Sequence, residues 1–258
     1  MQWEAFEHNF PIRLNMQQKQ AVQSVEGSVL LLAVPGSGKT TVLVTRLGYM
    51  IYCMGIEPES ILTVTYTVAA TRDMARRFAD CFGEEMAQRL TFRTINGICD
   101  RIIRYCAKSV GRTPFELITD ERVTAELLSA IYRQVQQEYP TESDLKNVRT
   151  LITYIKNSML TGEQIRKLDE EAGFAISEIY GEYRRQLRER RLMDYDDQLV
   201  YAYQMLQSFP ELLAHFQDTY RYLCVDEAQD TSRLQHAILE LLASKTHNLF
   251  MVGDEDQS

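Results

Sequence analysis

Two patterns of apolar and polar residues alternate along this chain, and their alternation predicts strands separated by helices. Short runs rich in leucine or β-branched residues predict buried strands, whereas apolar residues three or four positions apart predict helices. Strand patterns occupy residues 29–32, 61–65, 90–93, 222–225 and 249–252. Helical patterns lie between them, so the sequence predicts a parallel α/β sheet that binds ligands at the carboxyl ends of its strands.

A different pattern occupies the middle of the chain, from about residue 108 to 191. Apolar residues recur at helical spacing in three stretches, 123–135, 148–155 and 176–187, and no strand pattern separates them. The sequence therefore predicts an all-helical insert of about 80 residues, large enough for a small subdomain. Residues 1–107 and 192–258 are then the two parts of one α/β domain.

The segment between the first strand and the next helix, Ala33 to Thr40, has the pattern of a phosphate-binding loop. Its glycines let backbone N–H groups approach an anion, and the helix N-terminus adds about half a positive charge. Lys39 is expected to reach the β- and γ-phosphates of a nucleoside triphosphate, and the Thr40 hydroxyl to bind Mg²⁺. The strict pattern has glycine where this chain has Ala33. The loop residues expected to bind nucleotide are Pro35, Gly36, Ser37, Gly38, Lys39, Thr40 and Thr41.

Two acidic residues directly follow the buried strand 222–225. Asp226 is expected to hold Mg²⁺ opposite Thr40. Glu227 is expected to orient and deprotonate a water for in-line attack on the γ-phosphate. Gln257, after the next strand, is expected to donate its amide to that phosphate. Taken alone, the acidic pair also fits an exposed strand end and Gln257 a plain turn, but the lysine loop favours the catalytic interpretation.

A glutamine near the N-terminus is a candidate for base recognition. Gln18 lies in a short helix that Asn15 is expected to cap, and an amide offers the donor and the acceptor that the adenine edge requires. The alternative is a solvated helix residue.

Candidates for nucleic-acid contact lie after the second and third strands. Tyr66 is expected either to stack on a base or to sit at the edge of the core. Arginines cluster within 101–112 and 184–191, where they either contact phosphates or cover solvated helix faces.

Composition limits the class of protein. With a net charge of −8, the chain as a whole does not attract polyanions, so nucleic acid requires local basic patches or a groove. Its five cysteines form no C-x-x-C pair, which predicts reduced thiols in a cytoplasmic protein. No apolar run approaches the ~20 residues of a membrane span, and no signal peptide is recognised.

Taken together, these motifs resemble those of superfamily 1 DNA helicases of the UvrD/Rep group along nearly the whole chain. The segment around Gln18 resembles that group's Q motif. Residues 33–40 resemble motif I, in which alanine at the first position is usual. Residues 226–230 are similar to motif II in its D-E-x-Q-D form, and residues 253–258 to motif III.

Three further segments carry the likeness. Thr65-Tyr66-Thr67 resembles motif Ia, residues 94–97 resemble motif Ib, and residues 194–199 resemble the acidic-aromatic motif after the insert. The chain departs from the family where Val68-Ala69 replaces Asn-Lys and where Asn96 replaces His. The resemblance implies contacts with single-stranded DNA at Thr65, Tyr66, Thr67, Thr94 and Asn96.

The resemblance also implies a RecA-like P-loop NTPase sheet with a helical insert, the family's domains 1A and 1B, which uses ATP and Mg²⁺ and recognises adenine through Gln18. The parent protein is expected to be an ATP-dependent helicase that moves 3′ to 5′ on single-stranded DNA and unwinds duplex junctions. The second RecA-like domain of that parent, which carries the arginine finger, is the expected partner of this chain. Without it, we expect weak Mg-ATP binding, very slow hydrolysis and no unwinding.

Two other classes of protein fit part of the pattern. One is a P-loop protein that uses nucleotide only to switch partner binding, although the presence of Glu227 argues against it. The other is the helicase subunit of an AddA/RecB-type helicase–nuclease, which resembles this chain in the same motifs.

Overall fold

A computed structural model describes residues 1–34 and 36–255 of the chain. The chain divides into two compact units. The first contains Met1–Ile98, Leu206–Thr231 and His236–Ser258, and the second contains Cys99–Met205 and Ser232–Gln235. No helix in the described part of the chain is long and apolar enough to cross a membrane.

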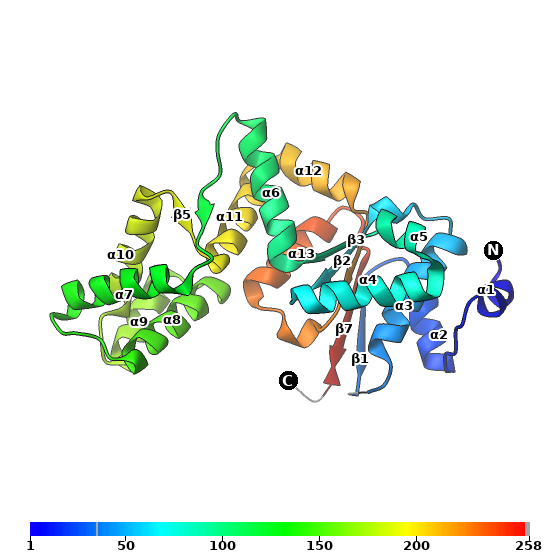
Figure 1. The fold of residues 1–258 in the computed structure, drawn as a ribbon, viewed down its shortest axis with the longest axis horizontal. Helices are drawn as coiled ribbons and strands as arrows, with labels where there is room; N and C mark the ends of the chain where they lie inside the picture. Colours follow the sequence, from blue (N-terminus) through cyan, green and yellow to red (C-terminus); the bar gives the residue numbers. More distant parts are fainter. Residues whose placement is uncertain (35, 256–258) are drawn as a thin grey trace. The chain divides into compact units, whose positions relative to one another are not determined.

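The first unit is built on a five-stranded sheet in the order β1-β7-β6-β2-β3 (Figure 1). All neighbouring strands are parallel, so their carboxyl ends share one edge of the sheet. The prediction of a parallel α/β sheet is confirmed, and each strand lies within two residues of the predicted run. The strands are β1 (Val29–Ala33), β2 (Ile61–Thr65), β3 (Thr91–Thr94), β6 (Tyr222–Val225) and β7 (Leu249–Asp254).

One face of this sheet is covered by α2 (Met16–Gln23), α3 (Lys39–Tyr52) and α4 (Val68–Phe82). Alternate residues of the strands, such as Phe250 and Val252 of β7, are buried in the same core as these helices. The helix α3 packs closely on α4, because a Cβ atom on Gly48 would lie 2.2 Å from the Phe82 ring. The other helices of this unit are α1 (Trp3–Asn9), η1 (Pro58–Ser60), α5 (Glu84–Arg89), α12 (Pro210–Thr219), η2 (Ala228–Asp230) and most of α13 (Arg233–Ala243).

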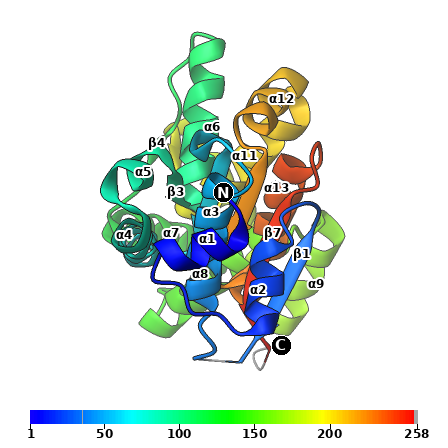
Figure 2. The same ribbon diagram turned by 90° about the vertical axis from the view of Figure 1, so that its right-hand side faces the viewer.

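The strand β1 lies at the edge of the sheet, and within the described residues it pairs only with β7 (Figure 2). Val29 and Leu31 pack against the core on the α3 side. Leu30 and Leu32 point to the other side and remain 59% and 53% exposed. A cavity of about 490 Å³ lies there, lined by residues of β1, β7 and α13. The strand that leads into the phosphate loop is therefore supported by the sheet on one side.

The second unit is a bundle of helices with a core of its own. It contains α7 (Glu121–Gln136), α8 (Glu142–Asn157), α9 (Gly162–Ala172) and α10 (Ile176–Glu189), together with most of α6 (Ile95–Ser109) and α11 (Tyr195–Ser208). The three predicted apolar stretches belong to α7, α8 and α10, which supply the buried core residues. The helix α9 has no fully buried residue, but its Ile165 and Leu168 pack partly buried against the same core.

The prediction of an all-helical insert is wrong in one detail. Two short parallel strands, β4 (Glu116–Leu117) and β5 (Leu192–Met193), pair where the chain enters and leaves the bundle. Two residues are too few to display the alternation by which a strand is recognised in a sequence.

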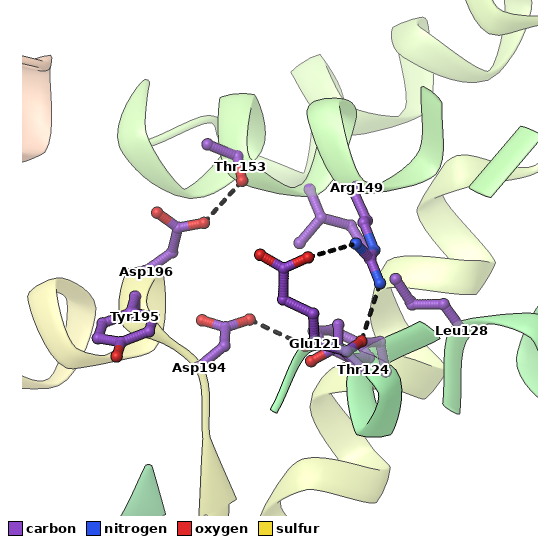
Figure 3. Close-up of a pocket in the computed structure, with 10 residues that line it drawn as sticks. Glu121, Thr124, Leu128, Arg149, Thr153, Asp194, Tyr195 and Asp196 are labelled. Atoms are coloured by element: carbon purple, nitrogen blue, oxygen red, sulfur yellow. Dashed lines mark hydrogen bonds and ion pairs between the residues drawn. The ribbon is translucent and has the colours of Figure 1, made fainter. Parts of the chain in front are cut away.

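A buried ion-pair network anchors the acidic-aromatic segment to this bundle. Lys156 of α8 is 3% exposed, and its ammonium lies 2.7 Å from Asp194 Oδ2 and 2.8 Å from Asp197 Oδ1. Burial by itself lowers the pKa of Lys156, but the two carboxylates outweigh burial and raise the pKa above its ordinary value. A neighbouring cavity of about 250 Å³ is lined by Asp196, which accepts a hydrogen bond from Thr153 (Figure 3). In this structure the segment holds α8 to the start of α11.

Candidate functional site

The loop between β1 and α3 has the backbone that a phosphate cradle requires. Gly36 and Gly38 adopt left-handed conformations, with φ of 78° and 84°, which residues with a side chain rarely adopt. The Ser37 N–H donates to Val34 O at 3.1 Å and closes the turn. The Ser37 hydroxyl is buried and has no hydrogen-bond partner among the described residues. Buried polar atoms without a partner are uncommon, and a bound ligand or a water can supply the missing partner.

Lys39, the first residue of α3, points into a cluster of carboxylates. Its ammonium donates to Asp254 Oδ1 and lies 3.6 Å from Glu227 Oε2. Burial lowers the pKa of Lys39, but the hydrogen bond to Asp254 and the charge of Glu227 more than offset it, so the pKa is raised. Strand register explains the contact, because Ala33 of β1 pairs with Asp254 of β7. The structure thus brings the start of the chain to its acidic segments.

Asp226 is the most buried acid of this site. It directly follows β6, its N–H donates to Val64 O at 3.1 Å, and it is 7% exposed. Burial, and next the charge of Glu227, raise the pKa of Asp226 above its ordinary value. A cation beside this carboxylate relieves both effects.

Gln229 fixes the neighbouring Glu227 side chain. Its Nε2 donates to Glu227 Oε2 at 2.5 Å, and its Oε1 accepts from the Asp254 N–H at 2.9 Å. A Cβ atom on Gly253 would lie 3.0 Å from Gln229 Oε1, so glycine permits this approach. Glu227 itself has a left-handed φ of 55°, which is uncommon for a residue with a side chain. One amide therefore connects the ends of β6 and β7.

The roles of Gln229 and Asp254 were missed by sequence reasoning. Both occur in the segments that resemble motifs II and III, and this was the only available signal. Their contacts depend on β6 and β7 being neighbours, which local sequence patterns do not reveal.

Gln18 lies directly over the phosphate loop. As predicted, Asn15 caps α2, and the two side chains form a reciprocal capping box. Gln18 Nε2 donates to Ser37 O at 2.9 Å, and Oε1 accepts from the Asn15 N–H at 2.9 Å. A Cβ atom on Gly38 would lie 3.2 Å from that amide nitrogen. These contacts use one N–H and one lone pair of the amide, so one of each is left for a base edge.

The remaining nucleotide candidates are placed as follows. Thr40 and Thr41 lie in the first turn of α3, half-buried and exposed respectively. Gly36 is exposed at the loop. Pro35 and Gln257 lie outside the described residues, so their assignments remain predictions from the sequence.

The candidates for DNA contact gather at the ends of β2 and β3, where Thr65 and Thr94 are register partners. Thr65 is 1% exposed, and its hydroxyl is hydrogen-bonded to the Thr71 hydroxyl at 2.6 Å. The Thr65 side chain therefore stabilises the turn from inside. The Tyr66 hydroxyl is hydrogen-bonded to Thr231. Burial raises the pKa of Tyr66.

Two of these candidates also have local structural roles. The exposed Thr67 caps α4 by accepting from the Ala70 N–H, and Thr94 accepts from the Gly97 N–H at 3.0 Å. Asn96 is half-buried beside Thr94 at the start of α6.

Comparison with known proteins identifies the class. The chain belongs to the UvrD/REP helicase N-terminal domain family, whose model matches residues 14–258. This confirms the resemblance recognised in the sequence.

Individual relatives agree with the family. The chain is 32% identical over 246 residues to the ATP-dependent DNA helicase PcrA of Leuconostoc citreum, an alignment that covers 95% of this chain and 33% of that protein. It is 32% identical over 252 residues to PcrA of Staphylococcus epidermidis, covering 95% of this chain and 34% of that protein. It is 31% identical over 252 residues to PcrA of Staphylococcus aureus, covering 95% of this chain and 33% of that protein. The chain thus spans about a third of the length of these curated relatives.

Proposed function

We propose that this chain is the ATP-binding N-terminal part of a UvrD-type DNA helicase, in which ATP hydrolysis drives movement along single-stranded DNA and duplex unwinding. The main observation in support is that Lys39 of the glycine loop forms ion pairs with Glu227 and Asp254 at the carboxyl ends of neighbouring strands. Family membership and the names of the relatives support the assignment. We further propose that the sheet is RecA-like and that residues 108–191 form the inserted subdomain.

In this proposal the loop binds the triphosphate of ATP. Its backbone N–H groups and the orphaned Ser37 hydroxyl donate to phosphate oxygens, and Lys39 exchanges Asp254 for the β- and γ-phosphates. Gln18 reads the adenine edge with the donor and acceptor that remain free. The phosphates of the nucleotide thus replace the Asp254 carboxylate as the negative partner of the Lys39 ammonium.

Mg²⁺ fits the donors present. Thr40 and Asp226 would hold it, and the burial of Asp226 is the structural reason to expect a cation there. The described residues contain no group of three His, Cys, Asp or Glu side chains that fits a metal ion. This agrees with Mg²⁺, which proteins bind through one or two carboxylates and substrate phosphates. When bound, the ion supplies charge that stabilises the phosphoryl oxygens.

Glu227 acts as the general base in this proposal. It orients a water in line with the γ-phosphorus and accepts its proton, while Gln229 fixes the carboxylate through a hydrogen bond to Oε2. Gln257 is proposed to contact the γ-phosphate.

Single-stranded DNA is proposed to cross the ends of β2 and β3, where Tyr66, Thr67, Thr94 and Asn96 lie. The second RecA-like domain of the parent protein is the proposed partner in hydrolysis. An arginine finger from it is worth roughly 10³–10⁵ in rate.

Nucleotide titration of the purified chain tests this function. We expect Mg²⁺-dependent ATP binding, hydrolysis far below that of a complete helicase, and no strand separation. A chain that binds no ATP with Mg²⁺ present, or that shows full DNA-stimulated ATPase activity alone, contradicts the proposal.

A further inference from the structure

Arg46 is a buried charged residue to which the proposed reaction assigns no role. It lies in the middle of α3 and is 2% exposed. Its guanidinium donates to four backbone carbonyls at the end of α2. The Nη1 acceptors are Ala21 O at 2.9 Å, Val22 O at 3.4 Å and Ser24 O at 2.6 Å, and Nη2 donates to Val25 O at 3.1 Å.

These contacts address a specific electrostatic need. The last carbonyls of a helix have no partner within the helix, and they carry the negative end of its dipole. The planar fork of an arginine satisfies several of them with one positive charge. The Phe250 ring of β7 lies 4.0 Å from the guanidinium carbon and adds a cation–π contact. Burial lowers the pKa of Arg46, but an arginine keeps its charge in proteins.

The helix α2 depends on these contacts because it is short. It contains eight residues, and isolated helices of fewer than about 12 residues are marginal in water. Arg46 thus determines where its C-terminal end lies against α3 and β7.

The other end of α2 carries Gln18, which contacts the phosphate loop through Ser37 O. Because that loop leads directly into α3, the two helices are joined at two points, one through Gln18 and the other through Arg46. A shift of α2 at the Arg46 end moves the Gln18 amide relative to the loop.

We propose that Arg46 is a positioning residue for base recognition, which holds α2 so that Gln18 discriminates adenine from other bases in a nucleotide bound at the loop. This inference rests on the proposed function, since it requires that the loop binds a nucleoside triphosphate and that Gln18 reads its base. Arg46 itself touches neither the base nor the phosphates.

The test compares three probes, each with Mg²⁺: ATP, GTP and inorganic tripolyphosphate. Their dissociation constants are measured calorimetrically for the 258-residue chain and for Arg46→Met and Arg46→Lys. Arg76→Met is the matched control, because Arg76 lies on α4 with 71% of its side chain exposed. Thermal unfolding establishes that each variant folds, and hydrogen exchange reports on the α2 amides. If Arg46→Met fails to fold, Arg46→Lys, which keeps the charge, carries the comparison.

We expect Arg46→Met to reduce the preference for ATP over GTP at least fivefold, with the tripolyphosphate dissociation constant unchanged within twofold. Arg46→Lys is expected to lose part of the preference for ATP over GTP, because one ammonium reaches fewer of the α2 carbonyls than the arginine guanidinium does. The α2 amides exchange faster in both, and Arg76→Met behaves as the unsubstituted chain.

Two outcomes overturn the inference alone. In one, a folded Arg46 variant keeps the full preference for ATP; in the other, all three probes weaken by the same factor, which indicates a general structural role. If the unsubstituted chain binds tripolyphosphate but shows no preference for ATP, base reading by Gln18 is wrong and this inference falls with it. If it binds none of the probes, the proposed function itself is wrong.

Discussion

The ammonium of Lys39 lies 3.6 Å from the carboxylate of Glu227, although the two residues belong to opposite ends of the sequence. One stands at the start of α3 and the other just beyond β6. The contact places the ammonium proposed to bind phosphate beside the carboxylate proposed to activate water. The helices of the second unit lie between these two residues in the sequence, and the sheet nevertheless brings them together.

Replacing Lys39 by methionine is expected to raise the dissociation constant of Mg-ATP about 100-fold. The estimate corresponds to two charge-assisted hydrogen bonds to phosphate at ~1.5 kcal/mol each. Titration calorimetry measures it. Lys245→Met is the control, because Lys245 pairs with Asp218 on the surface. Equal affinities of Lys39→Met and the unsubstituted chain would remove Lys39 from the nucleotide site.

Replacing Gln229 by leucine is expected to slow ATP hydrolysis about tenfold with little change in Mg-ATP affinity, because Glu227 loses the donor that orients it. The measurement is single-turnover hydrolysis with the protein in excess over ATP. Gln88→Leu on the exposed surface of α5 is the matched control. A rate equal to that of the control would show that Glu227 is held without Gln229.

Replacing Asp226 by asparagine is expected to stabilise the nucleotide-free chain by about 1 kcal/mol while abolishing Mg²⁺-dependent ATP binding. The buried carboxylate is costly when charged, and Asn removes that charge. The pKa of Asp226 is raised in the folded chain, so this carboxyl lowers stability as pH rises above 3.8, its ordinary value. Thermal unfolding at several pH values measures the effect. The exposed Asp230→Asn serves as control, and a loss of stability in Asp226→Asn would contradict the prediction.

Replacing Lys156 by methionine is expected to destabilise the helical unit by about 3 kcal/mol, because the buried Asp197 and the half-buried Asp194 lose their counter-charge. The folded pKa of Lys156 is raised above 10.5, so its stabilisation is complete at neutral pH and is lost only as pH rises beyond that value. The difference between the two proteins should therefore narrow in alkaline solution.

Denaturant unfolding at pH 7 and in alkaline solution measures this difference. The exposed Lys146→Met on the same helix controls for the loss of a surface charge. A Lys156 variant as stable as that control at pH 7 would show that the network contributes nothing.

Local patterns predicted the parts of the fold that short segments encode. The strand before the loop, the Asn15 cap and the apolar faces of the bundle are visible within a few residues of sequence. Strand order is not encoded locally. The pairing of Lys39 with Asp254 follows from β1 lying beside β7, and the amide bridge of Gln229 from β6 lying beside β7.

The burial of charged residues was likewise hidden from the sequence. Nothing in the sequence around Arg46 and Lys156 distinguishes them from arginines and lysines on solvated helix faces. Only the tertiary structure shows that both are buried. Thr65 is an example of an expected contact residue that is buried instead. The sequence resemblance implied a contact with DNA, but the Thr65 hydroxyl is hydrogen-bonded to Thr71 within the turn.

The position of β1 at the margin of the sheet has a thermodynamic consequence. Among the described residues, this strand, like β3 at the opposite edge, has a ladder on one flank only, and it leads into the loop proposed to bind the triphosphate. Segments with fewer backbone partners open more readily, and a ligand adds its binding energy where it is attached. Nucleotide should therefore slow amide exchange in β1 more than in β3, so that comparing the two edge strands reports occupancy of the loop.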